Sequence, residues 1–181
     1  MLDGYRGEMA IYALGDLEPK IDPTAYVHPD AVVIGDVTIE AEATIWPGAV
    51  LRGDYGQVYV GPRTSIQDGT VLHTTPRWPT VIGADCVVGH NAYLEGCTVE
   101  DHCLIASGSL VLNQVHVGKG AVVAAGAVVS ERSVVEPGTI VAGVPAKPRG
   151  SSEPFQGRIQ GGVDAYVRNG ARYQKELRRL D

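Results

Sequence analysis

The sequence has few cysteines, and their arrangement excludes a disulfide framework. Cys86, Cys97 and Cys103 are odd in number and form no CxxC pair, whereas small secreted domains rely on several paired cysteines. The first ten residues, MLDGYRGEMA, also lack the apolar core of a signal peptide. We therefore expect a cytoplasmic protein.

Basic clusters and long apolar runs are also absent. Lysine and arginine number 15 against 21 aspartates and glutamates, and the one short basic cluster is ELRRL near the end. A chain with this charge balance lacks the electrostatic footprint of a nucleic-acid-binding protein. No apolar run approaches the roughly 18 residues that a membrane-spanning helix requires. We expect one soluble domain that binds neither nucleic acid nor membranes.

An apolar residue returns at every sixth position through most of the chain. A period of six fits neither an α-helix nor a simple alternating strand, and it is typical of a β-helix built from hexapeptides. One short strand cannot bury its own apolar side chain, whereas stacked coils join such side chains into a continuous core. We therefore predict an all-β solenoid. The hexapeptide series comprises Ile21, Val27, Val33, Ile39, Ile45, Leu51, Val60, Ile66, Leu72, Ile82, Val88, Leu94, Val99, Ile105, Val111, Val117, Val123, Val129, Val135 and Val141.

The pattern divides this single domain into four segments. Residues 1–20 contain one apolar stretch that predicts a leading strand, and residues 21–146 form the β-helix of six to seven coils. Residues 147–162 are rich in Gly, Pro and Ser, which is typical of a connector. Apolar residues then recur at helical spacing, which predicts a C-terminal amphipathic helix over residues 163–180. This helix is expected to pack along the coil or on a neighbouring chain.

Three irregularities interrupt the series between residues 51 and 99. Three extra residues follow Leu51, four follow Leu72, and one is missing after Leu94. Loops that leave a regular solenoid tend to build its functional face. The polar residues of the segments LRGD, IQDGTVLH and VGHNAYLEGC gather at the same places. We therefore place the candidate site in this part of the coil.

Stacking should bring together side chains that are far apart in the sequence. Arg52, His73 and Glu95 each follow an apolar position of the series, one full coil apart, and should form one column. His90 belongs to the preceding side of its coil and faces a different direction. A metal ion held by His73 and Glu95 would therefore need His90 from another chain, which a threefold assembly would offer.

The segments WPGAVLRGD, IQDGTVLH, IGADCVVGHNAYLEGC and GVPAK together resemble the γ-class carbonic anhydrase family and its siderophore-binding and carnitine-operon relatives. The similarity covers most of residues 11–148. It implies a left-handed parallel β-helix with three hexapeptides per coil. It also implies a homotrimer with a metal between neighbouring subunits, usually zinc, with iron or cobalt as alternatives. The implied reaction is the reversible hydration of carbon dioxide to bicarbonate.

Carried over by position, the resemblance implies that the metal ligands are His73, His90 and Glu95. The family has histidine at all three positions, so Glu95 is a departure. A set of two histidines and one glutamate is a recognised catalytic zinc arrangement. The added negative charge should nevertheless make activated water less acidic, and so weaken hydration near neutral pH. Alternatively, Glu95 pairs with Arg52 or His73 and no metal binds.

The resemblance also implies roles for residues around these ligands. Gln67 is expected to orient solvent or substrate, with Asp68 beside it in the same segment. Arg52 and Asp54 are expected to pair across the subunit interface. Tyr166 of the C-terminal helix is expected to lean over the pocket.

Two other functions stay open at this point. One is acyl transfer from acyl-coenzyme A, which other hexapeptide proteins perform. That reaction normally needs a histidine that activates an acceptor hydroxyl and a groove for the cofactor, and nothing beyond the repeat marks either. The other is a binding or scaffold trimer without turnover.

Overall fold

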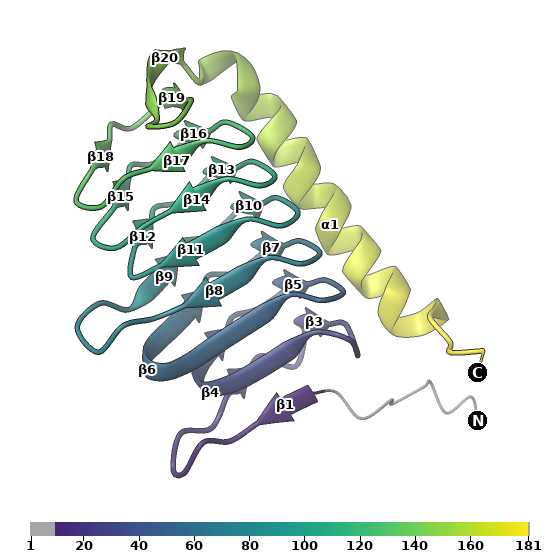
Figure 1. The fold of residues 1–181 in the computed structure, drawn as a ribbon. Helices are drawn as coiled ribbons and strands as arrows, with labels where there is room; N and C mark the ends of the chain where they lie inside the picture. Colours follow the sequence, from purple (N-terminus) through teal and green to yellow (C-terminus); the bar gives the residue numbers. More distant parts are fainter. Residues whose placement is uncertain (1–9, 181) are drawn as a thin grey trace.

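The computed structural model describes residues 10–180, which form a parallel β-solenoid of about seven turns flanked by one long helix (Figure 1). The predicted fold class is confirmed. The elements are β1 (Ala10–Tyr12), β2 (Lys20–Ile21), β3 (Tyr26–Val27), β4 (Val32–Ile39), β5 (Thr44–Ile45), β6 (Val50–Val60), β7 (Ser65–Ile66), β8 (Val71–His73), β9 (Thr80–Ile82), β10 (Val87–Val88), β11 (Tyr93–Glu95), β12 (Thr98–Val99), β13 (Leu104–Ile105), β14 (Leu110–Val111), β15 (His116–Val117), β16 (Val122–Val123), β17 (Val128–Val129), β18 (Val134–Val135), β19 (Thr139–Ala142), β20 (Lys147–Ser151), a 3₁₀ turn (Glu153–Phe155) and α1 (Gln156–Glu176).

The coil has three sides, each built by pairing between successive turns. We call the side made by β4, β6, β8, β11, β14 and β17 the ligand side. The side made by β3, β5, β7, β10, β13 and β16 is the helix side, because α1 lies along it. A third side runs from the ends of β4 and β6 through β9, β12, β15 and β18. Pairing between successive coils is parallel, and a partial first turn, in which β1 pairs with β4, closes one end.

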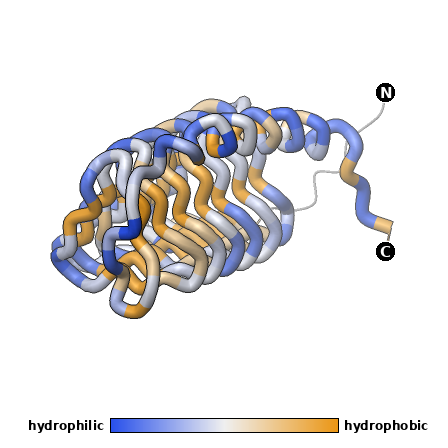
Figure 2. The backbone as a smooth tube through the Cα atoms, turned by 90° about the horizontal axis from the view of Figure 1, so that it is seen from above, coloured by the Kyte–Doolittle hydropathy of each residue, from blue (hydrophilic) through white to orange (hydrophobic). Residues whose placement is uncertain are grey.

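The hexapeptide series fills the interior of the coil as predicted. Every position of the series from Val27 to Val141 is buried, and Ile21 is partly buried against the same core. Hydrophobic positions recur at the same place in successive turns (Figure 2). Each fully buried side chain of this size contributes about 1.5–3 kcal/mol. The coil therefore depends on continuous apolar columns rather than on any single strand.

The extra residues after Leu51 do not form the expected loop. They lie within β6, which stays paired with β4 past a bulge between Gly35 and Val37 and so turns the corner from the ligand side to the third side. Gly53 permits this path, because a Cβ atom there would lie 2.3 Å from the carbonyl oxygen of Asp36. The backbones of β4 and β6 approach too closely at this corner for any side chain at Gly53.

The leading strand and the C-terminal segments also differ from their expected bounds. β1 is the leading strand, and Met9, the first residue of the apolar stretch over residues 9–14, lies outside the described residues. Residues 147–162 contain β20, the 3₁₀ turn and the beginning of α1, so the connector is far shorter than expected. α1 begins at Gln156 rather than at residue 163 and ends at Glu176 rather than at residue 180. Glycines at 157, 161 and 162 lower the helix propensity of this segment, so the sequence did not predict the first turns of α1. Burial of Ile159 stabilises these turns.

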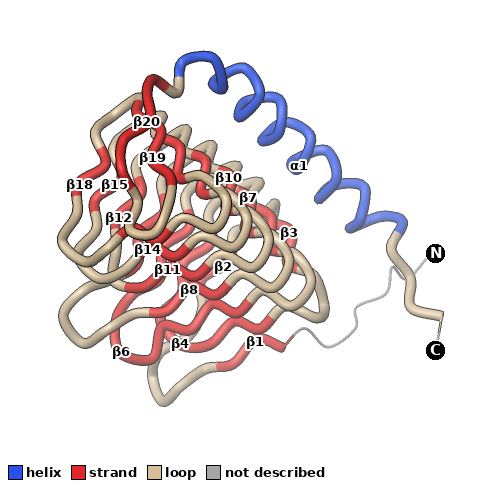
Figure 3. Tube along the Cα trace, turned by 45° about the horizontal axis from the view of Figure 1, so that its top comes forward, coloured by secondary structure: helices blue, strands red, loops and turns tan. Residues whose placement is uncertain are grey.

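The helix α1 runs along the helix side of the coil (Figure 3), and aromatic side chains attach it there. The ring of Trp46 lies 5.2 Å from that of Tyr173 and 5.6 Å from that of Tyr166, and the ring of Tyr26 lies 5.9 Å from that of Tyr173. Edge-on pairs of this kind add to the stabilisation from buried area. No helix of residues 10–180 is long and apolar enough to span a lipid bilayer.

An arginine links the coil to the middle of α1. Arg63 donates from Nε to Asp85 at 2.8 Å and from Nη2 to Asp164 of α1 at 2.6 Å. Gln174 further along the helix donates to the carbonyl oxygen of Ala25 at 3.1 Å. These contacts fix both the rotation and the position of the helix along the coil.

Gly170 provides the sharpest test of this packing. An added Cβ atom would lie 2.7 Å from Cγ2 of Thr44 and 3.1 Å from Cβ of Tyr26, so Gly170→Ala should push α1 away from the coil. Overpacking costs about 1–3 kcal/mol, more than the roughly 0.5–1 kcal/mol that replacing a helical glycine with alanine contributes. We expect a lower midpoint of unfolding in urea. Gly161→Ala is the matched control, because no atom lies within 4 Å of its Cβ position. It should raise the midpoint, and equal effects of both changes would contradict the packing described.

Candidate functional site

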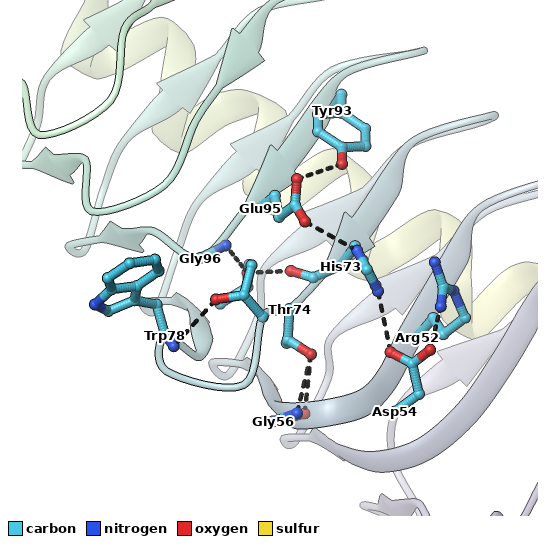
Figure 4. Close-up of polar contacts among 11 residues, drawn as sticks. Arg52, Asp54, Gly56, His73, Thr74, Trp78, Tyr93, Glu95 and Gly96 are labelled. Atoms are coloured by element: carbon cyan, nitrogen blue, oxygen red, sulfur yellow. Dashed lines mark hydrogen bonds and ion pairs between the residues drawn. The ribbon is translucent and has the colours of Figure 1, made fainter.

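Arg52, His73 and Glu95 form the predicted column on the ligand side. Parallel pairing places Arg52 of β6 opposite His73 of β8, and His73 opposite Glu95 of β11. The three side chains lie on successive turns (Figure 4). The order of the column follows from the period of the coil.

His73 lies between two carboxylates. Its Nδ1 is 3.2 Å from Oε1 of Glu95, and its Nε2 is 3.0 Å from Oδ1 of Asp54. The imidazole side chain is only 13% exposed, so it is largely shielded from solvent. Carboxylates on both nitrogens fix the orientation of the ring.

Arg52 and Asp54 form an ion pair within one chain. The Nη1 of Arg52 donates to Oδ2 of Asp54. The pairing across the subunit interface that the family resemblance implies stays a prediction. The two residues meet because side chains two positions apart on a strand point to the same face. Burial acts to raise the pKa of Asp54, but the hydrogen bond with His73 and the charge of Arg52 outweigh it, so this pKa lies below its usual value.

Tyr93 holds the second oxygen of Glu95, and the sequence analysis missed this residue. Its hydroxyl donates to Oε2 of Glu95 at 2.6 Å. Burial, together with the hydrogen bond to Glu95 and the charge of that carboxylate, raises the pKa of Tyr93 to about 12. The phenol therefore stays protonated and keeps donating. Its outward place in the hexapeptide, directly before a core leucine, was the signal that could have identified it.

Thr80 fixes the backbone beneath the column. Its hydroxyl donates to the carbonyl oxygen of His73 and accepts the N–H of Gly96 at 2.8 Å. Thr80 begins β9, directly after the segment 74–79 that leaves the coil as predicted. The missing residue after Leu94 corresponds to a tight turn at Gly96, where φ is +59°. The extra residues after Leu72 and the missing residue after Leu94 thus position the backbone on either side of His73 and Glu95.

His90 lies at the corner between the helix side and the ligand side, apart from His73. It sits on the turn from β10 to β11, and its Nδ1 is 2.9 Å from Oδ2 of Asp68 on the coil before. Both side chains are about half exposed, at 49% and 50%. Within residues 10–180 of one chain, no group of three or more His, Cys, Asp or Glu side chains is arranged to hold a metal ion.

The contact between His73 and Glu95 fits two ligands of one metal. Two ligand atoms of a tetrahedral zinc ion, each about 2.1 Å from the metal, lie roughly 3.4 Å apart. The distance of 3.2 Å between Nδ1 of His73 and Oε1 of Glu95 is close to this value. The same contact also fits the direct pairing considered above, so metal analysis decides between them.

A pocket of about 410 Å³ lies beside His90, between the helix side and α1. Gln67 forms part of its inner wall and is 5% exposed. Tyr166 lines the same pocket from α1. Burial and the charge of Asp68 raise the pKa of Tyr166, and a hydrogen bond with Gln67 offsets part of this rise. The pocket is lined by Gln67, Val87, Gly89, His90, Leu104, Ala106, Ser107, Phe155, Arg158, Ile159, Gly162 and Tyr166.

The sequence also missed Arg158 as a lining residue of this pocket. The sequence predicts a connector around Arg158. The neighbouring glycines lower helix propensity there, so the position of Arg158 on the first turns of α1 was not predicted. Only the docking of α1 on the coil brings Arg158 near Gln67.

Comparisons with known proteins place the chain among hexapeptide-repeat proteins. The family model for the bacterial transferase hexapeptide (six repeats) matches residues 79–113, and that for the hexapeptide repeat of succinyl-transferase matches residues 115–131. A putative acetyltransferase from Bacillus cereus superposes with a TM-score of 0.90 and 31% identity, covering 92% of this chain and 98% of that one. A hexapeptide transferase family protein from Anaplasma phagocytophilum superposes with a TM-score of 0.87 and 34% identity, covering 91% of this chain and 98% of that one.

Relatives of similar sequence identify one family among the hexapeptide-repeat proteins. The mitochondrial gamma carbonic anhydrase 2 of Arabidopsis thaliana is 42% identical over 138 residues, which are 73% of this chain but only 50% of that protein. The carnitine operon protein CaiE of Escherichia coli K12 is 37% identical over 139 residues, covering 77% of this chain and 71% of CaiE. The chain thus spans about half the length of the plant relative. The chain belongs to the γ-carbonic anhydrase-like family of hexapeptide-repeat proteins, which includes CaiE.

Proposed function

We propose that the protein is a homotrimer that binds a divalent metal between subunits and slowly catalyses the reversible hydration of carbon dioxide. His73 and Glu95 of one subunit and His90 of the next would hold the metal, which is zinc or another divalent ion such as iron or cobalt. The observation that carries this proposal is the 3.2 Å contact between His73 and Glu95 on the ligand side. Membership of the family supports the reaction.

The surface around this contact favours a neighbouring chain. Outward-facing apolar side chains form a second column beside His73 and Glu95, and Leu110 within it is 37% exposed. A flat apolar side next to an incomplete ligand set suits closed cyclic assembly of identical chains. The apolar column consists of Val50, Val71, Tyr93, Leu110 and Val128.

The residues of this chain prepare the site for a metal. Asp54 accepts from Nε2 of His73 and so leaves Nδ1 directed at Glu95, in the manner of carboxylates that orient metal-binding histidines. When bound, the metal supplies the Lewis acidity on which the hydration of carbon dioxide depends. Gln67 and Tyr166 present an amide and a hydroxyl beside His90, where they can orient water or substrate. The charge of Glu95 lowers the electrophilicity of the site, so we expect slow turnover.

A second candidate is transfer of an acyl group from acyl-coenzyme A. The observation that favours it is the structural match to the Bacillus cereus protein named a putative acetyltransferase. A calorimetric titration with acetyl-coenzyme A tests it. Micromolar binding would support acyl transfer, and absence of binding at millimolar concentration would remove this candidate.

Replacing Glu95 tests the proposed ligand set. Glu95→His should keep the metal. It should also raise hydration activity about tenfold at a pH where little of the activated water is ionised. The reason is that a decrease of one unit in the pKa of this water raises its ionised fraction about tenfold. His73→Ala and His90→Ala should each abolish metal retention. Elemental analysis of purified protein and stopped-flow hydration measure the two effects.

The matched control for these variants is His116→Ala. Like His73, His116 contacts a glutamate on a neighbouring coil, but it lies on the third side. Its Nε2 is 2.9 Å from Oε1 of Glu100. Its removal should leave metal content unchanged. Equal metal content in wild type, His73→Ala and His90→Ala would show that the ligand set is wrong.

Assembly can be tested on the apolar column. Leu110→Asp should convert a trimer, about three times the 19.1 kDa chain, into monomers, because the burial of a charge without a partner at the interface is costly. The variant should also lose metal. Val134→Asp on the third side, where Val134 is 62% exposed, should remain trimeric. Light scattering measures both masses, and a monomeric wild type at micromolar concentration would refute the shared site.

Tyr93→Phe tests the support of Glu95. The change removes the hydroxyl that donates to Oε2 of Glu95 at 2.6 Å and keeps the aromatic ring. Loss of such a supporting partner typically lowers metal affinity by about 10–100-fold. Competition with a chromogenic chelator measures the affinity. An unchanged affinity, with the trimer intact, would mean that Glu95 is not a ligand.

A further inference from the structure

The pocket beside His90 is larger than carbon dioxide requires. Its volume of about 410 Å³ lies within the range of roughly 300–1,000 Å³ typical of small-molecule sites, whereas carbon dioxide has three heavy atoms. The pocket lies between the corner of the coil and the first turns of α1. Its size is therefore a built feature of the fold that the hydration of carbon dioxide leaves unexplained.

The lining of the pocket suits a ligand with an apolar segment. Val87 and Leu104 contribute aliphatic side chains from the helix side, Phe155 contributes its ring from the 3₁₀ turn, and Ile159 contributes from α1. Val87 and Ile159 are buried, while Phe155 is 37% exposed, so the apolar wall extends from the interior to the rim. Gln67 adds one buried amide. Such a surface favours a short hydrocarbon chain over a fully polar ligand.

The charges of the pocket suit an anion. None of its lining residues is acidic, and Arg158 is its one arginine or lysine. Within residues 10–180, no salt bridge joins Arg158 to a carboxylate. Asp68, on the coil before His90, is already paired with Nδ1 of His90 at 2.9 Å. A guanidinium at the rim of an apolar pocket is well suited to a carboxylate, which it can bind with two parallel hydrogen bonds.

We propose that this pocket binds a small organic monocarboxylate with a short unbranched hydrocarbon chain. The carboxylate pairs with Arg158 at the rim, and the chain lies against Val87, Leu104 and Ile159. This inference goes beyond the hydration of carbon dioxide and does not require the metal. In the proposed trimer the pocket adjoins the shared site through His90, so its ligand lies where it can act as substrate or regulator of that site.

Titration of the purified protein with hexanoate tests the proposal. Affinity should rise roughly fourfold for each methylene added between acetate and hexanoate, as expected for buried apolar surface. Hexanamide, which keeps the chain and lacks the charge, should bind at least tenfold more weakly. Arg158→Gln should weaken hexanoate binding to the same extent, whereas Arg168→Gln on the same helix, outside the pocket lining, should leave it unchanged.

A second pair of variants tests the location without removing charge. An added Cβ at Gly162 meets only Cγ2 of Val87 at 3.7 Å, so Gly162→Leu should fill the pocket without disturbing α1 and abolish binding. Gly161→Leu is the matched control, because its Cβ position has no atom within 4 Å and lies outside the lining. Equal binding of hexanoate and hexanamide, or unchanged hexanoate binding in Arg158→Gln or Gly162→Leu, would overturn the proposal.

The His73→Ala variant separates this proposal from the metal site. Hexanoate binding that persists in His73→Ala supports the pocket, even if the wild type proves to hold no metal. Binding that is lost in His73→Ala but retained in Gly162→Leu would mean that the carboxylate binds at the metal instead, and the pocket proposal would be wrong. No binding of hexanoate to the wild type at millimolar concentration would also overturn it.

Discussion

Parallel pairing between successive turns is the constraint on which the rest of the structure depends. It fixes the register of each turn on the one before, so side chains that are some twenty residues apart meet in a single column. This register is what brings His73 to Glu95. The apolar interior keeps the register in place, because a shift by one residue would turn every core side chain outward. The geometry of the candidate site is therefore a property of the whole coil.

The helix α1 adds what the coil alone lacks. Stacked hexapeptides give three flat sides with little depth, and the pocket beside His90 forms where α1 lies over the corner of the coil. The aromatic contacts of Trp46 and the ion pair between Arg63 and Asp164 hold the helix there. The ligand side thus offers one part of the proposed metal site, and the corner offers the other part together with a pocket.

The sequence predicts those features that follow from its period. The buried series and the column of Arg52, His73 and Glu95 were predicted because each turn repeats the same spacing. Features that depend on a close approach or on docking were missed. Gly53 lets β6 turn a corner where a loop was expected, and burial of Ile159 starts α1 within an apparent connector. Supporting contacts such as that of Tyr93 depend on side-chain direction, which periodicity alone does not rank.

The claim that the site is shared between chains can be tested by mixing two inactive variants. A His73→Ala chain keeps His90, and a His90→Ala chain keeps His73 and Glu95, so neither variant alone can form a complete site. If the two are dissociated and reassembled together in equal amounts, roughly one quarter of the interfaces of a cyclic trimer should combine both intact parts. The account predicts that metal binding returns to about that fraction of the wild-type level. Reassembled mixtures that bind no more metal than either variant alone would contradict it.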